Sequence, residues 1–152
     1  MLHLSVPDFV VKSIKGWLLA FFFLSLSACA DKEPEPVSPD NWQKVTEQGL
    51  FEVTLDPAVD GPVAINEFLE WVLTVKTPDG EPVDPARISV NGGMRAHGHG
   101  LPSQPQVGEH PEAGKYLLKG LQFSMNGLWQ LAFDIQSKEQ SDKVTFELKI
   151  DY

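Results

Sequence analysis

Two histidines and a methionine lie within six residues of one another near the middle of the chain. Met94 is followed by His97 and His99, and a glycine follows each imidazole. Glycine lets the backbone curl, so that side chains two positions apart can converge on one point. Imidazole and thioether together suit copper, the thioether favouring the cuprous state, whereas zinc is better served by thiolates or carboxylates. The pattern therefore predicts a copper site formed by Met94, His97 and His99.

A purely structural role is the alternative for this segment. A glycine-rich loop with histidines also makes sharp connections between sheets, with the rings hydrogen-bonded to neighbouring carbonyl groups. Two further candidate ligands are His110 and Met125, the latter beside the Asn126-Gly127 turn signal. Met125 continues the alternating apolar positions of Leu121 and Phe123, which favours core packing. The polar residues around His110 predict that it is exposed to solvent.

The elements that position these residues are predicted to be strands. Apolar side chains recur at every second position, which is typical of a strand with one buried face. The clear runs are 51–55, 69–75, 129–135 and 144–150, and weaker runs are 88–94 and 116–125. Pro78-Asp79-Gly80 predicts a turn, and Asn126-Gly127 predicts a tight hairpin. Trp71 and Trp129 occupy core-facing positions and are interpreted as packing anchors.

These runs indicate an all-β fold, because no part of the domain shows a sustained period of 3.6 residues. Six to seven short strands within about 105 residues predict an antiparallel β-sandwich of immunoglobulin type. A single antiparallel barrel is the competing architecture. We assign residues 46–152 to this domain.

The segment around the histidines also resembles a known family. The motifs that carry the resemblance are Gly92-Gly93-Met94, His97-Gly98-His99-Gly100-Leu101-Pro102, Gly114-Lys115-Tyr116 and Gly127-Leu128-Trp129-Gln130-Leu131. They are similar to motifs of the YtkA-like domain, which is related to FixH-like proteins. The resemblance runs from about residue 68 to residue 135. It implies a small immunoglobulin-like β-sandwich exported across the inner membrane, in a family associated with copper handling.

The only cysteine of the chain indicates where the protein is located. Leu26-Ser27-Ala28-Cys29 follows an apolar run with two lysines upstream. This order resembles the lipobox of bacterial lipoproteins, in which the cysteine becomes the lipidated first residue after cleavage. The apolar run is shorter than the roughly 20 residues of a membrane span, which favours a signal peptide over an uncleaved anchor. We therefore expect residues 1–28 to be a signal peptide and Cys29 to be lipidated.

Residues 29–45 are predicted to be the lipidated start and a flexible, acidic and proline-rich tether. Ala30 follows the cysteine, which predicts an outer-membrane lipoprotein facing the periplasm if the cell has two membranes. In a cell with one membrane, the protein is expected to face outward from it. Removal of the leader leaves 10 Lys+Arg against 20 Asp+Glu, a formal charge of −10. Such a surface repels nucleic acid and anionic lipid, so we expect membrane contact through the acyl chains and no nucleic-acid partner.

The residues bear on three classes of function. An enzyme is disfavoured, because lipid consumes the lone cysteine and the chain has no Gly-x-Ser-x-Gly motif. The prediction is a cell-envelope lipoprotein whose sandwich binds or delivers copper through the Met-x2-His-x-His loop, with Met125 as an additional candidate ligand. The alternative is a non-metal interaction module that docks on a protein assembly of the envelope.

Overall fold

A computed structural model of the chain describes residues 42–57 and 61–151. The predicted signal peptide, Cys29 and most of the predicted tether lie outside these residues. The described elements are nine strands and a short 3-10 helix: β1 (Gln43–Val45), β2 (Glu52–Asp56), β3 (Leu69–Lys76), β4 (Arg87–Met94), η2 (Arg95–His97), β5 (His99–Gly100), β6 (Gln106–Glu109), β7 (Lys115–Leu121), β8 (Gly127–Ser137) and β9 (Gln140–Ile150).

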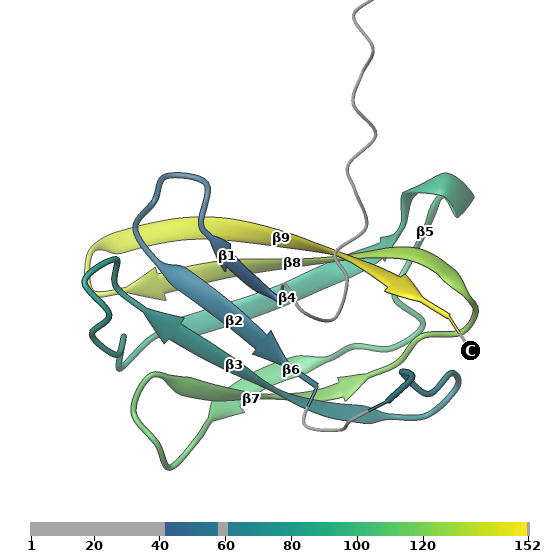
Figure 1. Ribbon diagram of the computed structural model, residues 1–152, viewed down its shortest axis with the longest axis horizontal. Coiled ribbons are helices and arrows are strands. Elements are labelled where there is room, and N and C mark those ends of the chain that lie inside the picture. Colours follow the sequence, from purple (N-terminus) through teal and green to yellow (C-terminus); the bar gives the residue numbers. More distant parts are fainter. Residues whose placement is uncertain (1–41, 58–60, 152) are drawn as a thin grey trace, which may run out of the picture. The chain divides into compact units, whose positions relative to one another are not determined.

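The strands form two antiparallel sheets that pack as a sandwich (Figure 1). One sheet has the order β1-β2-β3-β7-β6, and the other has the order β5-β4-β8-β9. The all-β sandwich predicted from the sequence is therefore confirmed. The competing closed barrel is not formed, since the described strands divide between two separate sheets.

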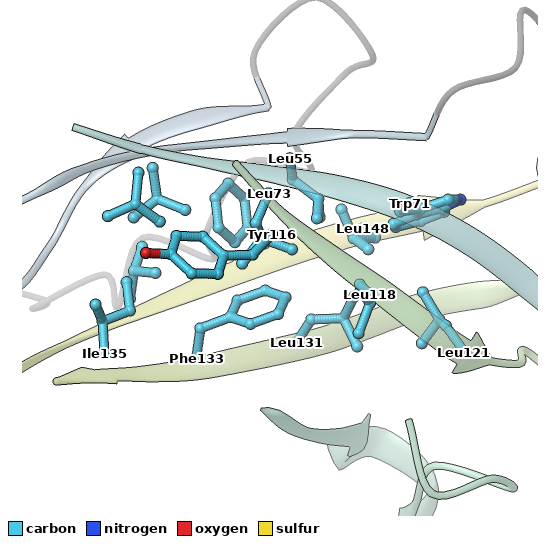
Figure 2. Packing of buried hydrophobic residues seen from close by; sticks show 14 of the residues in the cluster. Leu55, Trp71, Leu73, Tyr116, Leu118, Leu121, Leu131, Phe133, Ile135 and Leu148 are labelled. Atoms are coloured by element: carbon cyan, nitrogen blue, oxygen red, sulfur yellow. The ribbon is translucent and has the colours of Figure 1, made fainter. Parts of the chain in front are cut away.

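Alternation of apolar residues places one face of each long strand in the core. In β3, Trp71 and Leu73 are fully buried, while Val72 between them is more exposed. In Figure 2, side chains from β3 and β7, such as Leu73 and Tyr116, face those from β8, such as Leu131 and Phe133. Burial of apolar surface stabilises the folded state by about 25 cal/mol per Å², so this shared core is the main source of the domain's stability. The alternation of apolar residues in the sequence thus matches the alternation of side chains between the two faces of each strand.

Three short strands were not predicted, and one domain boundary was wrong. β1, β5 and β6 contain two to four residues each, too few to show alternation. Residues 43–45, assigned to the tether, are strand β1, and they pair with β2. Trp42 also packs on Trp71, with ring centroids 5.0 Å apart. The domain therefore begins by Trp42 within the described chain, because the indole adds apolar surface to the core.

The Asn126-Gly127 signal was interpreted wrongly as a hairpin. β7 and β8, which flank it, belong to different sheets, so this segment crosses from one layer to the other. Phe123 is fully buried in the crossing. The Pro78-Asp79-Gly80 turn is confirmed, since the Gly80 N–H donates to the Thr77 carbonyl at 2.9 Å. The local signal for a bend was right in both places, but tertiary packing decided which strands the bend joins.

Asp142 of β9 links the two sheets through a buried carboxylate. Its oxygens accept the backbone N–H groups of Gln48 at 3.0 Å and Leu50 at 3.2 Å, both in the turn between β1 and β2. The Lys143 N–H donates to the same carboxylate at 2.8 Å. Burial raises the pKa of Asp142, but hydrogen bonds from the Thr46 hydroxyl and from these N–H groups lower it more. The net pKa therefore lies below the ordinary value, as expected for a carboxylate that accepts several N–H groups.

Among the residues that the structure describes, no helix is both long enough and apolar enough to cross a membrane.

We predict that Asp142→Asn destabilises the domain in a pH-dependent way. The amide would place its own N–H donors against those of Gln48 and Leu50, lowering the free energy of unfolding by about 1–3 kcal/mol at neutral pH. A carboxylate whose pKa is lower in the folded state than in the unfolded state stabilises the fold at pH values above its unfolded pKa of about 3.9. This stabilisation is lost as the pH falls through the folded-state pKa. The difference between variant and wild type should therefore shrink in acid. Urea unfolding at several pH values measures it.

The matched control is Asp134→Asn, the same chemical change at a carboxylate that is 54% exposed and pairs with Lys143. Its effect should stay within about 0.5 kcal/mol at every pH, because exposed ion pairs contribute little. A destabilisation by Asp142→Asn that stays constant into acid would contradict an ionised, hydrogen-bonded carboxylate.

Candidate metal centre

The candidate ligands lie where β4 ends and the chain reverses into β5. η2 makes the reversal, and Gly98 closes it in the left-handed conformation, with φ of 67°. The Gly98 N–H donates to the Arg95 carbonyl at 3.1 Å. The returning strand places His99 directly opposite Met94. Because opposed residues of an antiparallel pair leave the sheet on the same side, these two side chains share one face.

Gly92 and Gly93 allow β4 to lie close to the strands on both of its sides. A Cβ on Gly92 would collide with the Gln130 carbonyl oxygen of β8, and one on Gly93 with the His99 carbonyl oxygen of β5. Gly93 also has φ of 156°. Both glycines are therefore required by backbone packing that brings β5, and with it His99, against the sheet.

Met94 points into the core and is only 2% exposed. A Cβ added at Gly127 would lie 2.6 Å from the Met94 methyl carbon, so a larger residue there would require the end of the Met94 side chain to move. Gly127 has φ of 132°, which also favours glycine. The predicted thioether ligand thus lies at the inner side of the loop, below the exposed histidines.

His99 is held by two contacts. Its ring meets the buried Trp129 ring edge-on, with centroids 5.6 Å apart. Its Nδ1 lies 3.0 Å from the Gly100 carbonyl oxygen. A carbonyl oxygen can only accept, so Nδ1 carries the proton in this contact and Nε2 keeps its lone pair. A metal-binding histidine is commonly oriented in this way, its second nitrogen donating to a carbonyl group.

His97 is exposed at the C-terminal end of η2, and its ring lies beside that of His99. The two ring centroids are 5.9 Å apart, with an angle of 40° between the planes. Metal–nitrogen bonds are about 2.0–2.1 Å long, so two rings at this separation can reach one ion between them. The structure therefore brings His97 and His99 together.

Met125 does not pack in the core as the alternation predicted, since its side chain is 38% exposed. The crossing between the sheets carries it past the end of β7, where alternation no longer decides which way a side chain points. Its backbone carbonyl accepts the Trp129 indole N–H at 3.0 Å. Met125 therefore lies at the same end of the sandwich as His99, through their shared neighbour Trp129.

His110 lies apart from this loop and is half-buried, not exposed as predicted. It follows β6, at the opposite end of β7 from Leu121. Its Nδ1 accepts the Glu112 N–H at 3.1 Å, which gives it a local role in the turn. The hydrogen bond explains why a histidine in a polar stretch is still partly covered.

The described residues do not supply a complete set of oxygen or thiolate ligands around the histidine loop, residues 95–100. Within residues 42–57 and 61–151, no three His, Cys, Asp or Glu side chains gather as a metal site would require. Beside the loop lies an open hollow of about 680 Å³, bordered by Gly93, Arg95, His99 and Gln130 among others. The Met94 thioether is the third candidate ligand that the strand pairing places opposite His99.

The contact of Trp129 with His99 was not predicted from the sequence. Alternation correctly assigned Trp129 to the core, and it is fully buried. Its contact with His99 depends on the pairing of β4 with both β5 and β8. The only sequence signal for that contact was the shared occurrence of the Gly-Leu-Trp motif and the His-Gly-His motif.

Comparison with known proteins identifies the family. The sequence profile described as YtkA-like matches residues 50–134, which include the histidine loop, Trp129 and Met125. No curated protein matches the chain. Among solved structures, the ZirS C-terminal domain aligns at 14% sequence identity and a TM-score of 0.39, covering 98% of this chain and 88% of that one. The profile spans more than half of the sequence, and the protein accordingly belongs to the YtkA-like family.

Proposed function

We propose that this protein is a cell-envelope lipoprotein whose β-sandwich binds copper at His97, His99 and Met94. One observation carries the proposal: His99 is paired in register with Met94, while its ring lies 5.9 Å from that of His97. Residues that are two and five positions apart in sequence are thereby gathered at one end of the domain. The Gly100 carbonyl leaves Nε2 of His99 available as a ligand.

The available donors favour cuprous copper over zinc. Two imidazoles and one thioether form a soft set, and soft thioether ligands select Cu(I). Structural zinc sites have four ligands, usually thiolates and imidazoles. Such a set does not assemble among the described His, Cys, Asp and Glu residues. Met125 is a further thioether on the same end of the sandwich, as the Trp129 indole bond shows.

Exposure of both histidines suits transfer of the ion as well as binding. The rings of His97 and His99 face solvent, whereas Met94 is buried beneath them. A partner protein can therefore reach the ion from the imidazole side without unfolding the loop. The hollow beside the loop gives such a partner a concave place to approach.

A non-metal interaction module is the second candidate, and one exposed aromatic residue favours it. Phe68 is 74% exposed just before β3. The Asn66 N–H donates to the Phe123 carbonyl at 2.7 Å, so this segment lies at the same end as the histidine loop. Exposed aromatic side chains are typical of protein-binding surfaces. This function requires no metal and predicts partner binding without copper.

The anchor at the membrane rests on the sequence of the leader. Cys29 follows the lipobox-like residues, and acylation there would tether the domain to a membrane of the cell envelope. No nucleic-acid partner is proposed, because the charge after leader removal is strongly negative. We propose no catalytic activity.

We predict that replacing both histidines, His97→Ala with His99→Ala, abolishes copper binding. The full-length protein is purified in detergent without a histidine tag and titrated with Cu(I) against a competing chelator. The wild type should take up copper stoichiometrically, and the double variant should fall to the level of a protein without a site. His110→Ala, which removes an imidazole at the other end of β7, should bind like the wild type. A wild-type protein that takes up no copper would refute the metal function and leave the interaction module.

The thioether assignment is tested by a pair of matched variants, Met94→Leu and Met125→Leu. Leucine nearly preserves the volume of methionine, so both variants should remain folded. We expect Met94→Leu to weaken Cu(I) binding by roughly tenfold or more, the scale of effects seen when metal sites are perturbed. Met125→Leu should weaken it less. The reverse order in a Cu(I) titration would assign the thioether to Met125.

Lipidation is tested at Cys29. We predict that intact-mass spectrometry of the envelope protein shows a chain that begins at Cys29 and carries the added mass of acyl groups. Cys29→Ser should accumulate as a precursor without that mass, because the hydroxyl does not replace the thiol in the modification. Ser27→Ala, which keeps a small residue in the same motif, should be processed normally. A wild-type chain without acyl mass would contradict the lipoprotein assignment.

A further inference from the structure

β9 is an edge strand, and one half of its open side has no partner among the described residues. It ends the order β5-β4-β8-β9. The Glu47 N–H donates to the Lys143 carbonyl at 2.8 Å, and the Lys44 ammonium donates to the Thr145 carbonyl at 2.9 Å. The β1 region therefore covers the first half of this edge. Figure 1 shows β1 near that half, while the rest of β9 continues toward the C terminus.

The backbone groups at Glu147 and Lys149 face the open side. In an antiparallel strand the N–H and C=O of one residue point the same way, and the direction alternates along the strand. The backbone groups of Lys143 and Thr145 point away from β8, because their carbonyl oxygens accept hydrogen bonds from the β1 region. By the same alternation, the backbone groups of Glu147 and Lys149 also point away from β8. Within residues 42–57 and 61–151 nothing bonds to these outward-facing groups. Unpaired edges of this kind are templates for another strand.

The sequence of this half-strand is complementary to itself. If two copies of β9 run antiparallel about a two-fold axis at Leu148, Glu147 of each lies opposite Lys149 of the other. This register pairs residues of the same outward direction, so both backbone hydrogen bonds can form at each pair. It also aligns Phe146 with Ile150, both buried on the core face. Phe146 and Ile150 are already buried in their own core, so the opposite charges of Glu147 and Lys149 favour this register. Within each chain these charges also contact Gln130 at 2.6 Å and Asp151 at 2.9 Å.

We propose that the protein forms a two-fold symmetric dimer through the second half of β9, joining two four-stranded sheets into one. The covered first half limits the pairing to a short segment, so the interface is small and the association is weak in dilute solution. Two copies anchored on one membrane would meet at a much higher effective concentration. β5 lies at the opposite edge of the sheet, so the histidine loop remains uncovered and dimerisation does not depend on copper.

Charge reversal tests the register directly. Full-length protein in detergent is studied by sedimentation velocity over a range of concentrations. Glu147→Lys or Lys149→Glu places like charges opposite each other at two symmetric positions, and each should raise the dimer dissociation constant by about tenfold. The double variant, Glu147→Lys with Lys149→Glu, restores both pairs and should dimerise like the wild type. This rescue would not occur if the single changes acted by disturbing the fold.

The controls lie on the turn between β8 and β9, away from the proposed axis. Glu139→Lys and Lys138→Glu make the same charge changes and should leave dimerisation unchanged. A carbodiimide, which joins a carboxylate to an amine without a spacer, should give a covalent dimer linked between Glu147 and Lys149. A wild-type protein that stays monomeric at all concentrations would overturn the proposal, as would a double variant that fails to recover.

Discussion

The packing of Trp129 between the core and the histidine loop is the interaction on which the candidate site depends. The indole is fully buried and contacts Phe123 edge-on at 5.3 Å on one side and His99 at 5.6 Å on the other. Its N–H, a donor that needs an acceptor when buried, bonds to the Met125 carbonyl. One side chain thereby holds two segments together, the crossing between β7 and β8 and the segment around His99, which is distant from it in the chain.

Glycines make this arrangement sterically possible. The glycines at 92 and 93 let β4 approach its neighbours, and Gly127 leaves room for the Met94 side chain. Glycines in the segment serve two purposes: Gly98 permits the reversal, and Gly92 and Gly93 permit close packing. A motif that looks like a ligand-binding signature in the sequence is thus in large part a packing requirement. The two histidines are the members of the motif that packing leaves exposed and available for chemistry.

The two ends and two edges of the sandwich carry different roles. The end with the histidine loop gathers the candidate ligands and the exposed Phe68, whereas the buried Asp142 carboxylate links the β1–β2 turn to β9 near the other end. On the four-stranded sheet, β5 presents His99 at one edge and β9 presents a self-complementary strand at the other. A metal function and an association of two copies can therefore coexist on one small domain.

The fold class, the buried faces and the candidate ligands could be predicted from the sequence, because alternation and donor chemistry are properties of neighbouring residues. It assigned Trp71 and Trp129 to the core correctly, since each lies in a run with a period of two. It erred at Met125 and at Asn126-Gly127, where the chain leaves one sheet for the other. The pairing of His99 with Met94, the contact of His99 with Trp129 and the edge of β9 left open by the described residues could not be predicted in this way. Those relations follow from which strands pair, and strand pairing depends on the burial of a shared core by residues distant in sequence.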